Sequence, residues 1–317
     1  MKPEISIIVC TYNGENLIKN CLNSILSQNY KNFEVLCIDG MSSDKTREII
    51  KGYIKKDKRI KLIINDKRLP EGKGYGKWLG YENAKGEIFG IIDQDNVLQD
   101  RNLFEKAVGI FKKENKILGI LGGLTHDKKD KPVTRFVALT GGDLFFAYRS
   151  IDFLRHIRRF ENKDGCEVLK MNINNMPLTG GNCFFYLKKD LDKIGGYSQD
   201  ILIIDKLVKR GFNELVIMPN STKHYAETSF FNLIKKKFRW GKSFKSDRNI
   251  EKFNYLPKTK KERKAFIKNL FFCLLIIPDF IYSIKLYAKT KDTIAFLFPI
   301  MAFFNTIAYS LTYLSHK

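Results

Sequence analysis

Short apolar runs alternate with amphipathic segments over the first hundred residues of the chain. Four of these runs predict strands of a sheet: Ile5–Cys10, Phe33–Ile38, Ile60–Ile64 and Ile88–Ile92. The first and the last of them are expected to be buried. Between the first two runs, apolar residues from Leu17 to Ile25 recur at spacings of three and four, which predicts a helix. Strands that alternate with helices are typical of βαβ units, so we predict the α/β class with a mostly parallel sheet.

Polar and acidic residues follow the last of these runs directly, as Asp93, Gln94, Asp95 and Asn96. In open α/β sheets the ligand site lies outside the carboxyl ends of the strands. Two carboxylates one residue apart repel each other unless a cation lies between them. We therefore predict a site for Mg²⁺ or Mn²⁺ at Asp93 and Asp95, where the ion would hold a diphosphate. The alternative is a solvated Asp-x-Asp turn.

Three segments resemble the nucleotide-sugar motifs of the family 2 glycosyltransferases: Val9–Asn13, Ile38–Asp44 and Asp93–Asp95. The resemblance extends over roughly residues 4 to 240. It implies the GT-A fold, a Rossmann-like and mostly parallel sheet flanked by helices. It also implies an enzyme that transfers a sugar, with inversion, from a nucleoside diphosphate donor with the help of Mg²⁺ or Mn²⁺.

The resemblance also implies roles for individual residues. Residues expected to bind the nucleotide sugar are Thr11, Tyr12, Asn13, Glu15, Asp39, Ser43, Asp44 and Asp93. Asp95 is the expected direct metal ligand, and Asp93 contacts the ribose or a metal-bound water. For Asp39 and Asp44 the alternative is that they cap turns.

Three basic or imidazole side chains are further candidates for this site. His224 follows the predicted strand Leu215–Pro219, and some members of this fold add a histidine to the metal ligands; the alternative is a structural histidine. Lys73 lies in a glycine-rich stretch with Lys77, where the backbone could approach phosphate. The alternative for both lysines is solvated surface charge.

The second half of the chain is expected to hold the acceptor site, at Gly180, Gly181 and Asn182. Inverting transfer is a single displacement that needs one general base. The family usually has Glu-Asp after its Gly-Gly-aromatic segment, whereas this chain offers Asp200 and Asp205. Counting forward from the glycines favours Asp205, and counting backward from the predicted helix end favours Asp200. We favour Asp205, whose alternative role is to cap a helix over residues 206–210.

Lys236–Trp240 resembles the Gln-x-x-Arg-Trp motif of processive polysaccharide synthases, with lysine in place of glutamine. By this resemblance Arg239 and Trp240 contact the acceptor or the diphosphate. The substitution leaves processivity open.

The charge of the chain is unevenly placed. The formal net charge is +22, and residues 221–265 alone carry 14 Lys/Arg against 4 Asp/Glu. Such a block suits nucleic acid or an anionic membrane.

The 22 residues from Thr293 to Leu314 contain no charge and are long enough to span or enter a bilayer, and Asn269–Pro278 suits an interfacial or re-entrant helix. The apolar stretches favour the membrane as the partner, and no nucleic acid is expected.

We therefore predict a catalytic domain over residues 1–240, with a nucleotide-sugar half (1–125) and an acceptor half (126–240). Residues 241–317 form a basic linker and membrane-associated helices. The lysines between the apolar stretches favour a first segment that lies on the membrane. The alternative is that both apolar helices pack on the protein itself. We expect the catalytic domain to face the cytoplasm at the inner, cytoplasmic membrane, because nucleotide sugars are made in the cytoplasm. No secretory signal is visible at the N-terminus. The six cysteines lie mostly in apolar segments without metal spacing, so we expect them to be reduced.

The function predicted from the sequence is glycosyl transfer to a lipid-linked or cell-envelope glycan acceptor. Two alternatives stay open. The chain could be a non-catalytic family member that binds a sugar nucleotide, because the usual Glu-Asp pair is missing. It could also, with less support, be a basic nucleic-acid-binding protein.

Overall fold

A computed structural model describes residues 2–67, 74–114, 116–140, 165–171, 182–198, 200–225, 229–246 and 260–314. The chain divides into two compact units. The first contains Met1–Thr125 and Arg155–Tyr225, and the second contains His126–Leu154 and Ala226–Lys317. The residues predicted as the acceptor half are thus divided between the units.

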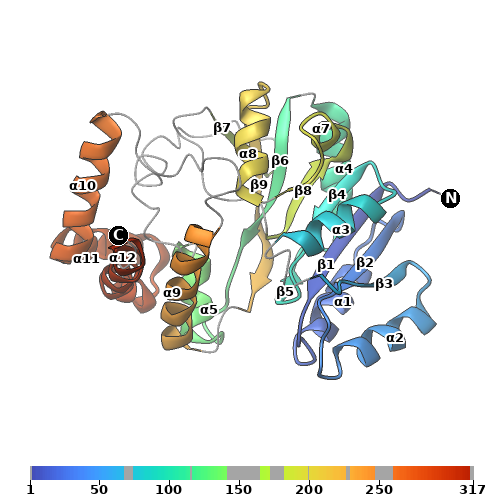
Figure 1. Cartoon of the computed structure of the whole chain (residues 1–317), viewed down its shortest axis with the longest axis horizontal. Helices are drawn as coiled ribbons and strands as arrows, with labels where there is room; N and C mark the ends of the chain where they lie inside the picture. The colour runs from blue at the N-terminus through green and yellow to red at the C-terminus, as the bar shows by residue number, and fades with distance from the viewer. Residues whose placement is uncertain are drawn as a thin grey trace. The chain divides into compact units, whose positions relative to one another are not determined.

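A mixed sheet forms the centre of the first unit, in the order β3-β2-β1-β4-β8-β6-β9-β5, with β7 paired to β9 (Figure 1). The first four strands are parallel: β1 (Ile5–Thr11), β2 (Phe33–Asp39), β3 (Ile60–Ile64) and β4 (Ile88–Ile91). The remaining strands are β5 (Asn96–Leu98), β6 (Ile117–Leu124), β7 (Glu167–Lys170), β8 (Phe184–Leu187) and β9 (Glu214–His224). The strand β8 runs antiparallel to both β4 and β6. The four strands that the apolar runs predict are confirmed.

Helices cover both faces of the sheet. These helices are α1 (Ile18–Leu26), α2 (Thr46–Lys56), α3 (Tyr75–Asn83), α4 (Leu103–Lys113), α7 (Lys188–Asp192) and α8 (Asp200–Lys209). Ile5, Ile7 and Val9 point from β1 into a core shared with α1 and α4. On the opposite face, a Cβ at Gly80 of α3 would lie 2.5 Å from Ile8, so α3 packs closely on the sheet there. The buried strands thus hold their polar carboxyl ends in fixed positions.

The helix α8 begins six residues earlier than the sequence predicts. The run Ile201–Ile204 resembles a strand in its composition, but Ile203, Ile204 and Leu207 are buried at helical spacing. Asp205 therefore lies in the middle of α8, and the alternative role given to it, as the N-cap of a helix over 206–210, is wrong. Asp200 is the residue at which the helix begins.

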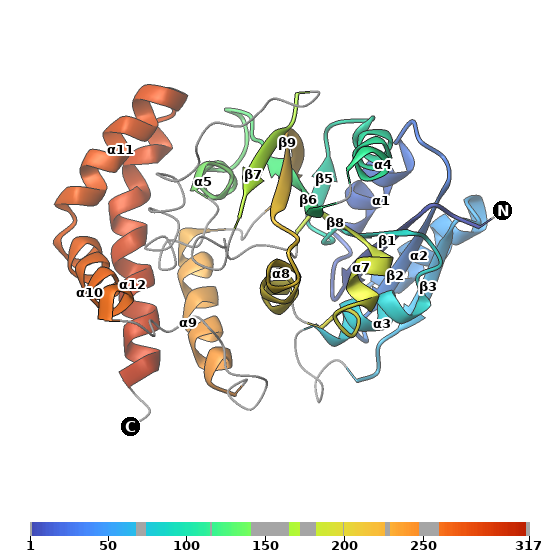
Figure 2. The same ribbon diagram turned by 90° about the horizontal axis from the view of Figure 1, so that it is seen from above.

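The second unit is helical among its described residues. It comprises α5 (Pro132–Thr140), α9 (Phe230–Ser246), α10 (Lys260–Leu275), α11 (Ile277–Thr290), the 3-10 turn η2 (Thr293–Leu297) and α12 (Phe298–Leu314). The helix α12 packs against α9, α10 and α11 (Figure 2). An ion pair between Arg135 and Asp292 connects α5 to the start of η2.

The uncharged stretch Thr293–Leu314 is not one helix, because η2 precedes the 17 residues of α12. Within the described part of the chain, the helices are too short or too polar to cross a bilayer. Five described cysteines are free: Cys10, Cys21, Cys37, Cys166 and Cys183. Four of these five are buried, as expected for reduced core residues.

Candidate functional site

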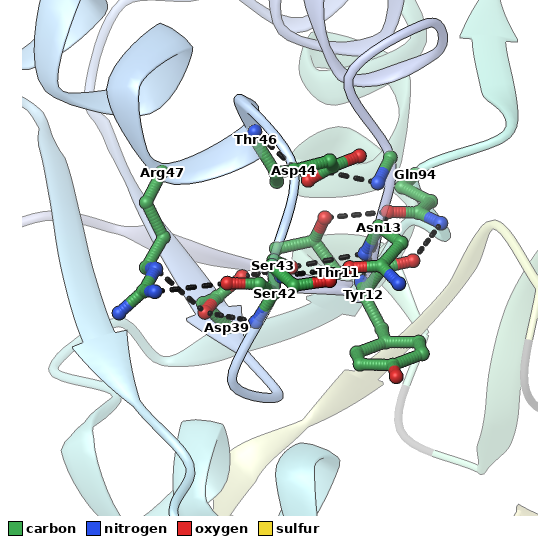
Figure 3. Close-up of polar contacts among 11 residues, drawn as sticks. Thr11, Tyr12, Asn13, Asp39, Ser42, Ser43, Asp44, Thr46, Arg47 and Gln94 are labelled. Atoms are coloured by element: carbon green, nitrogen blue, oxygen red, sulfur yellow. Dashed lines mark hydrogen bonds and ion pairs between the residues drawn. The ribbon is translucent and has the colours of Figure 1, made fainter.

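The loops that follow β1 and β2 are joined by hydrogen bonds into one polar surface (Figure 3). The backbone N–H of Asn13 donates to Ser42 Oγ at 2.9 Å, and Asn13 Oδ1 accepts from the Ser43 N–H at 2.9 Å. Asn13 has a φ of 46°, a left-handed conformation that asparagine tolerates better than most residues. The Glu15 N–H likewise donates to Asp44 Oδ2 at 3.0 Å. Donor-binding candidates from separate motifs are thus brought together.

The two acidic residues of the second loop shape this surface. Asp39 is fully buried at the end of β2 and accepts hydrogen bonds from the backbone N–H and the hydroxyl of Ser42. The Nε atom of Arg47 lies 3.7 Å from Asp39 Oδ2. Asp44 accepts from the Thr46 N–H at 3.0 Å at the start of α2. Both carboxylates therefore have the turn-capping contacts that the alternative interpretation describes.

Gln94 connects the Asp93–Asp95 segment to the first loop, a role that the sequence analysis missed. Its Oε1 atom accepts from Thr11 Oγ1 at 2.5 Å and from the Tyr12 N–H at 3.2 Å, and its Nε2 donates to the Tyr12 carbonyl at 3.2 Å (Figure 3). A Cβ at Gly14 would lie 2.1 Å from the same Oε1 atom. A side chain at residue 14 would therefore force Gln94 to move. The only signal in the sequence is the position of Gln94 between the two acids.

Asp95 lies beside His224 because β5 pairs with β9, with Asn96 opposite His224. The Nε2 atom of His224 is 3.5 Å from Asp95 Oδ2, and its Nδ1 is 3.1 Å from Asn96 Oδ1. The tautomer of His224 decides what Nε2 can do. Donation from Nδ1 to Asn96 would leave Nε2 able to accept a hydrogen bond or bind a metal ion, whereas an Nδ1 that accepts from the Asn182 amide N–H, 2.6 Å away, would put the proton on Nε2. Asn182, which is expected to bind the glycan acceptor, forms hydrogen bonds with both Asn96 and His224. The structure therefore brings together two expected metal ligands and one residue expected to bind the glycan acceptor.

Lys77 links Asp93 to Asp200. Its Nζ atom is 2.8 Å from Asp200 Oδ2 and 3.8 Å from Asp93 Oδ1, and 15% of its side chain is exposed. Lys77 is therefore not the solvated surface charge of the alternative interpretation. Burial lowers the pKa of Lys77, but the two carboxylates outweigh this effect and raise the pKa above its usual value. The position of Lys77 in the first turn of the helix that follows β3 was the signal that could have placed it in this site.

The carboxylates around Lys77 have unequal surroundings. Partial burial raises the pKa of Asp93 to about 6, and Asp95 and Asp200 add to the rise while Lys77 opposes it. Asp200 also accepts a hydrogen bond from the hydroxyl of Tyr197, a residue that is itself buried. One oxygen of Asp200 is thus held by Lys77 and the other by Tyr197.

Asp205 has a different setting from Asp200. Its Oδ2 atom pairs with Lys209 at 2.5 Å, one turn further along α8. Its other oxygen is buried without a hydrogen-bond partner. The placement therefore favours Asp200 over Asp205 as the third carboxylate of the site.

Several expected site residues lie outside this description. Lys73, Gly180 and Gly181 are outside the described residues. The backbone of Arg239 and Trp240 belongs to α9 in the second unit, but their side chains are not among those described.

The donor atoms near Asp95 suit a divalent metal ion that also binds a diphosphate. Asp95 Oδ1 is buried and has no hydrogen-bond partner in the structure, so one ligand oxygen is available. Among the described residues, no three His, Cys, Asp or Glu side chains converge as a metal site. Mg²⁺ typically takes one or two protein carboxylates and completes its coordination with phosphate oxygens and water. Asp95 fits that pattern, and His224 beside it would add a nitrogen ligand to the set.

The sequence profile described as glycosyl transferase family 2 matches residues 6–194. A relative from Methanococcus voltae is 27% identical over 94% of this chain and 92% of its own length. It is the dolichyl N-acetyl-alpha-D-glucosaminyl phosphate 3-beta-D-2,3-diacetamido-2,3-dideoxy-beta-D-glucuronosyltransferase. The GalNAc(5)-diNAcBac-PP-undecaprenol beta-1,3-glucosyltransferase of Campylobacter jejuni is 33% identical over 30% of this chain and 31% of its own.

Solved structures share the fold. A mannosyltransferase from Pyrobaculum calidifontis in complex with GDP-Man and Mn²⁺ aligns with a TM-score of 0.59 at 15% identity, over 100% of this chain and 89% of that chain. Residues 1–349 of S. aureus TarS in complex with UDP-GlcNAc align with a TM-score of 0.51 at 16% identity, over 99% and 91% of the two chains. These similarities support the predicted GT-A fold.

Proposed function

Because the chain belongs to glycosyl transferase family 2, we propose that this glycosyltransferase moves a sugar from a nucleoside diphosphate donor to a lipid-linked or cell-envelope glycan acceptor. The donor class is supported by the nucleotide sugars in the complexes of its structural relatives. The acceptor class is supported by two relatives whose names describe dolichyl phosphate-linked and undecaprenol-linked acceptors.

We assign the general base to Asp200, and the contact of Lys77 with both Asp200 and Asp93 carries this assignment. A base for inverting transfer must lie near the donor diphosphate, and Lys77 connects Asp200 to the segment expected to bind it. Asp205 instead pairs with Lys209 on its own helix. Tyr197 and Lys77 hold the two oxygens of Asp200 from different sides and so fix the orientation of the carboxylate.

The proposed reaction is a single displacement. Asp200 accepts the proton of the acceptor hydroxyl, whose oxygen forms a bond to the anomeric carbon. The bond from that carbon to the diphosphate oxygen breaks, and its electron pair leaves with the diphosphate. The configuration at the anomeric carbon is inverted, and no covalent intermediate with the enzyme is needed. Asp200 afterwards releases its proton to solvent.

The loops after β1 and β2 bind the nucleoside in this proposal. Asp39 and Asn13 fix the backbone of the two loops, and the exposed ring of Tyr12 lies beside them. Asp95 and His224 would hold Mg²⁺ or Mn²⁺, and Asp93 would contact the ribose or a metal-bound water. A bound ion would supply Lewis-acid stabilisation of the charge on the departing diphosphate.

We also propose that the enzyme acts at the cytoplasmic membrane with its catalytic unit in the cytoplasm. Lipid-linked acceptors are held in a membrane, and nucleotide sugars are made in the cytoplasm. The apolar and basic composition of residues 260–314 supports this location.

The test is a transfer assay with a panel of nucleotide sugars, Mn²⁺ or Mg²⁺, and a membrane lipid extract as acceptor. Asp200→Asn should lower kcat by at least a hundredfold and leave donor affinity within a few fold. Asp205→Asn is the matched control on the same helix and should keep nearly full activity. If Asp205→Asn lost activity and Asp200→Asn kept it, the general base would instead be Asp205. Donor binding without turnover by the unaltered protein on any acceptor would instead support the non-catalytic alternative.

A further inference from the structure

The corner between α10 and α11 carries large apolar side chains on its surface. Between residues 271 and 284, the following are each between 42% and 60% exposed: Phe271, Leu275, Ile276, Phe280, Ile281 and Ile284. Soluble proteins seldom expose so many large apolar side chains within so short a segment, and such a surface usually marks an interaction site.

These side chains lie on defined faces of the two helices. Phe271 and Leu275 are four residues apart on α10, as are Phe280 and Ile284 on α11, so each pair lies on one side of its helix. The two helices pack against each other and against α12. The exposed faces meet at Ile276, the residue between the two helices.

Ile276 has a φ of 62°, a left-handed conformation that strains a β-branched residue. Glycine, which has no Cβ, would form the same turn with less strain. The corner nevertheless has an apolar side chain there, 42% exposed to solvent. An exposed apolar side chain at this strained position supports the interpretation that the corner faces an apolar medium.

Lysines border the apolar corner on both sides along the chain. Lys260, Lys264 and Lys268 precede it on α10, and Lys285, Lys289 and Lys291 follow it; all six are exposed. In the described part of residues 260–314, the acidic side chains Asp279 and Asp292 are both buried. The exposed charges of known placement around the corner are therefore all positive.

Apolar side chains bordered by lysines suit the interface of an anionic lipid bilayer. Such side chains enter the boundary between headgroups and acyl chains, while lysines extend their ammonium groups to the phosphates. A protein partner would need an apolar hollow ringed by acidic residues, which is a narrower requirement. We infer that the α10–α11 corner inserts into the headgroup region of an anionic bilayer and holds the enzyme on that surface without crossing it.

The choice of a lipid bilayer as the partner of this corner rests on the proposed membrane location of the enzyme, but it does not depend on the transfer reaction. The test is flotation of the purified full-length protein on a sucrose gradient, without donor or acceptor. The vesicles contain either phosphatidylcholine alone or phosphatidylcholine with 30% phosphatidylglycerol. We expect the protein to float with the anionic vesicles, to float less with the neutral ones, and to float less in 0.5 M NaCl.

Two sets of variants separate the apolar and basic contributions. Phe280→Asp with Ile281→Asp should weaken binding to anionic vesicles by at least tenfold, whereas Ile64→Asp on the exposed side of β3 should leave it unchanged. Lys285→Glu with Lys289→Glu changes only exposed positions, so it should fold, and it should abolish the preference for anionic vesicles. Thermal melting confirms that each variant is folded.

Three results would overturn the inference. The unaltered protein could fail to float with anionic vesicles, or the corner variants could float as well as it does. The corner variants could also convert a dimer to a monomer in light scattering while vesicle binding is absent, which would make this face a contact between two copies of the chain. Normal transfer to a water-soluble acceptor in any of these cases would leave the proposed reaction intact.

Discussion

The ammonium group of Lys77 lies 2.8 Å from a carboxylate oxygen of Asp200, a residue 123 positions further along the chain. The same group lies 3.8 Å from Asp93. This one side chain thus connects the segment after β4 to the start of α8. It holds Asp200, the proposed base, close to the expected donor site.

Lys77→Met should therefore impair catalysis more than folding. The change would leave Asp93 and Asp200 close together without a cation, so we expect kcat/KM to fall by at least tenfold, about 1.4 kcal/mol or more in transition-state stabilisation. Lys77→Arg keeps the charge and should retain part of the activity. Lys106→Met, which breaks an exposed ion pair with Asp100, is the control and should have little effect. Equal losses in the Lys77→Met and Lys106→Met variants would argue against a role for Lys77 in the site.

Gly14→Ala should disturb the donor loops through Gln94. The new Cβ would lie 2.1 Å from Gln94 Oε1, so the glutamine must move away from Thr11 and Tyr12. We expect donor affinity, measured by calorimetry, to fall by about tenfold, which corresponds to about 1.4 kcal/mol.

The matched control for Gly14→Ala is Gly52→Ala in α2, where a Cβ would meet no atom within 4 Å. That variant should keep its donor affinity and gain about 0.5–1 kcal/mol of stability from helix propensity. Adding Gln94→Ala to Gly14→Ala should relieve the clash but not restore the hydrogen bonds. Unchanged affinity in Gly14→Ala would show that the two loops adjust independently.

Glu34 should make the stability of the first unit depend on pH. Burial raises the pKa of Glu34, but hydrogen bonds from Lys61, the Lys85 N–H and Ser6 outweigh this effect and hold the pKa below its usual value. A lowered pKa in the folded state stabilises the protein above the unfolded pKa, and the contribution is lost as pH falls through the folded value.

Glu34→Gln should therefore lower the free energy of unfolding at pH 7 by about 1–3 kcal/mol, and the difference should shrink below about pH 4. Urea unfolding at several pH values measures it. Glu114→Gln, at the residue that follows α4 in the same unit, is the control. A difference that stays constant from pH 7 to pH 3 would contradict the proposed electrostatic origin.

Removal of the metal should weaken donor binding if Asp95 and His224 hold the ion. We expect chelator, Asp95→Asn and His224→Ala each to lower affinity for the preferred nucleoside diphosphate, the two substitutions by about tenfold or more. Binding would be measured by calorimetry with and without Mn²⁺. Chelator should have little further effect on Asp95→Asn. Full metal dependence in both variants would place the ion elsewhere.

The parallel half of the fold could be predicted from the sequence, because buried strands such as Ile5–Thr11 are marked by continuous apolar runs. The start of α8 could not, because Ile201–Ile204 has the composition of a strand and only tertiary burial shows its helical period. Which residues of the site contact one another also could not be predicted from the sequence. Lys77 on α3 meets Asp200 at the start of α8, and Asp95 meets His224 through the pairing of β5 with β9. Spacing along the chain reveals neither contact. The division of Thr293–Leu314 into η2 and α12 depends on Asp292, whose carboxylate accepts the Ile294 N–H and starts a tighter turn.

The pairing of β5 with β9 also determines when during synthesis the contacts of the site can form. The strands β1 to β4 lie within the first 91 residues and can pair while the ribosome is still extending the chain. Asp95 meets His224 only through a contact 129 residues away in sequence, after β9 has emerged. A nascent polypeptide can thus form the parallel strands early, yet the proposed metal ligands meet only when most of the protein has been translated. Truncated products that end before His224 would then lack the contact between Asp95 and His224.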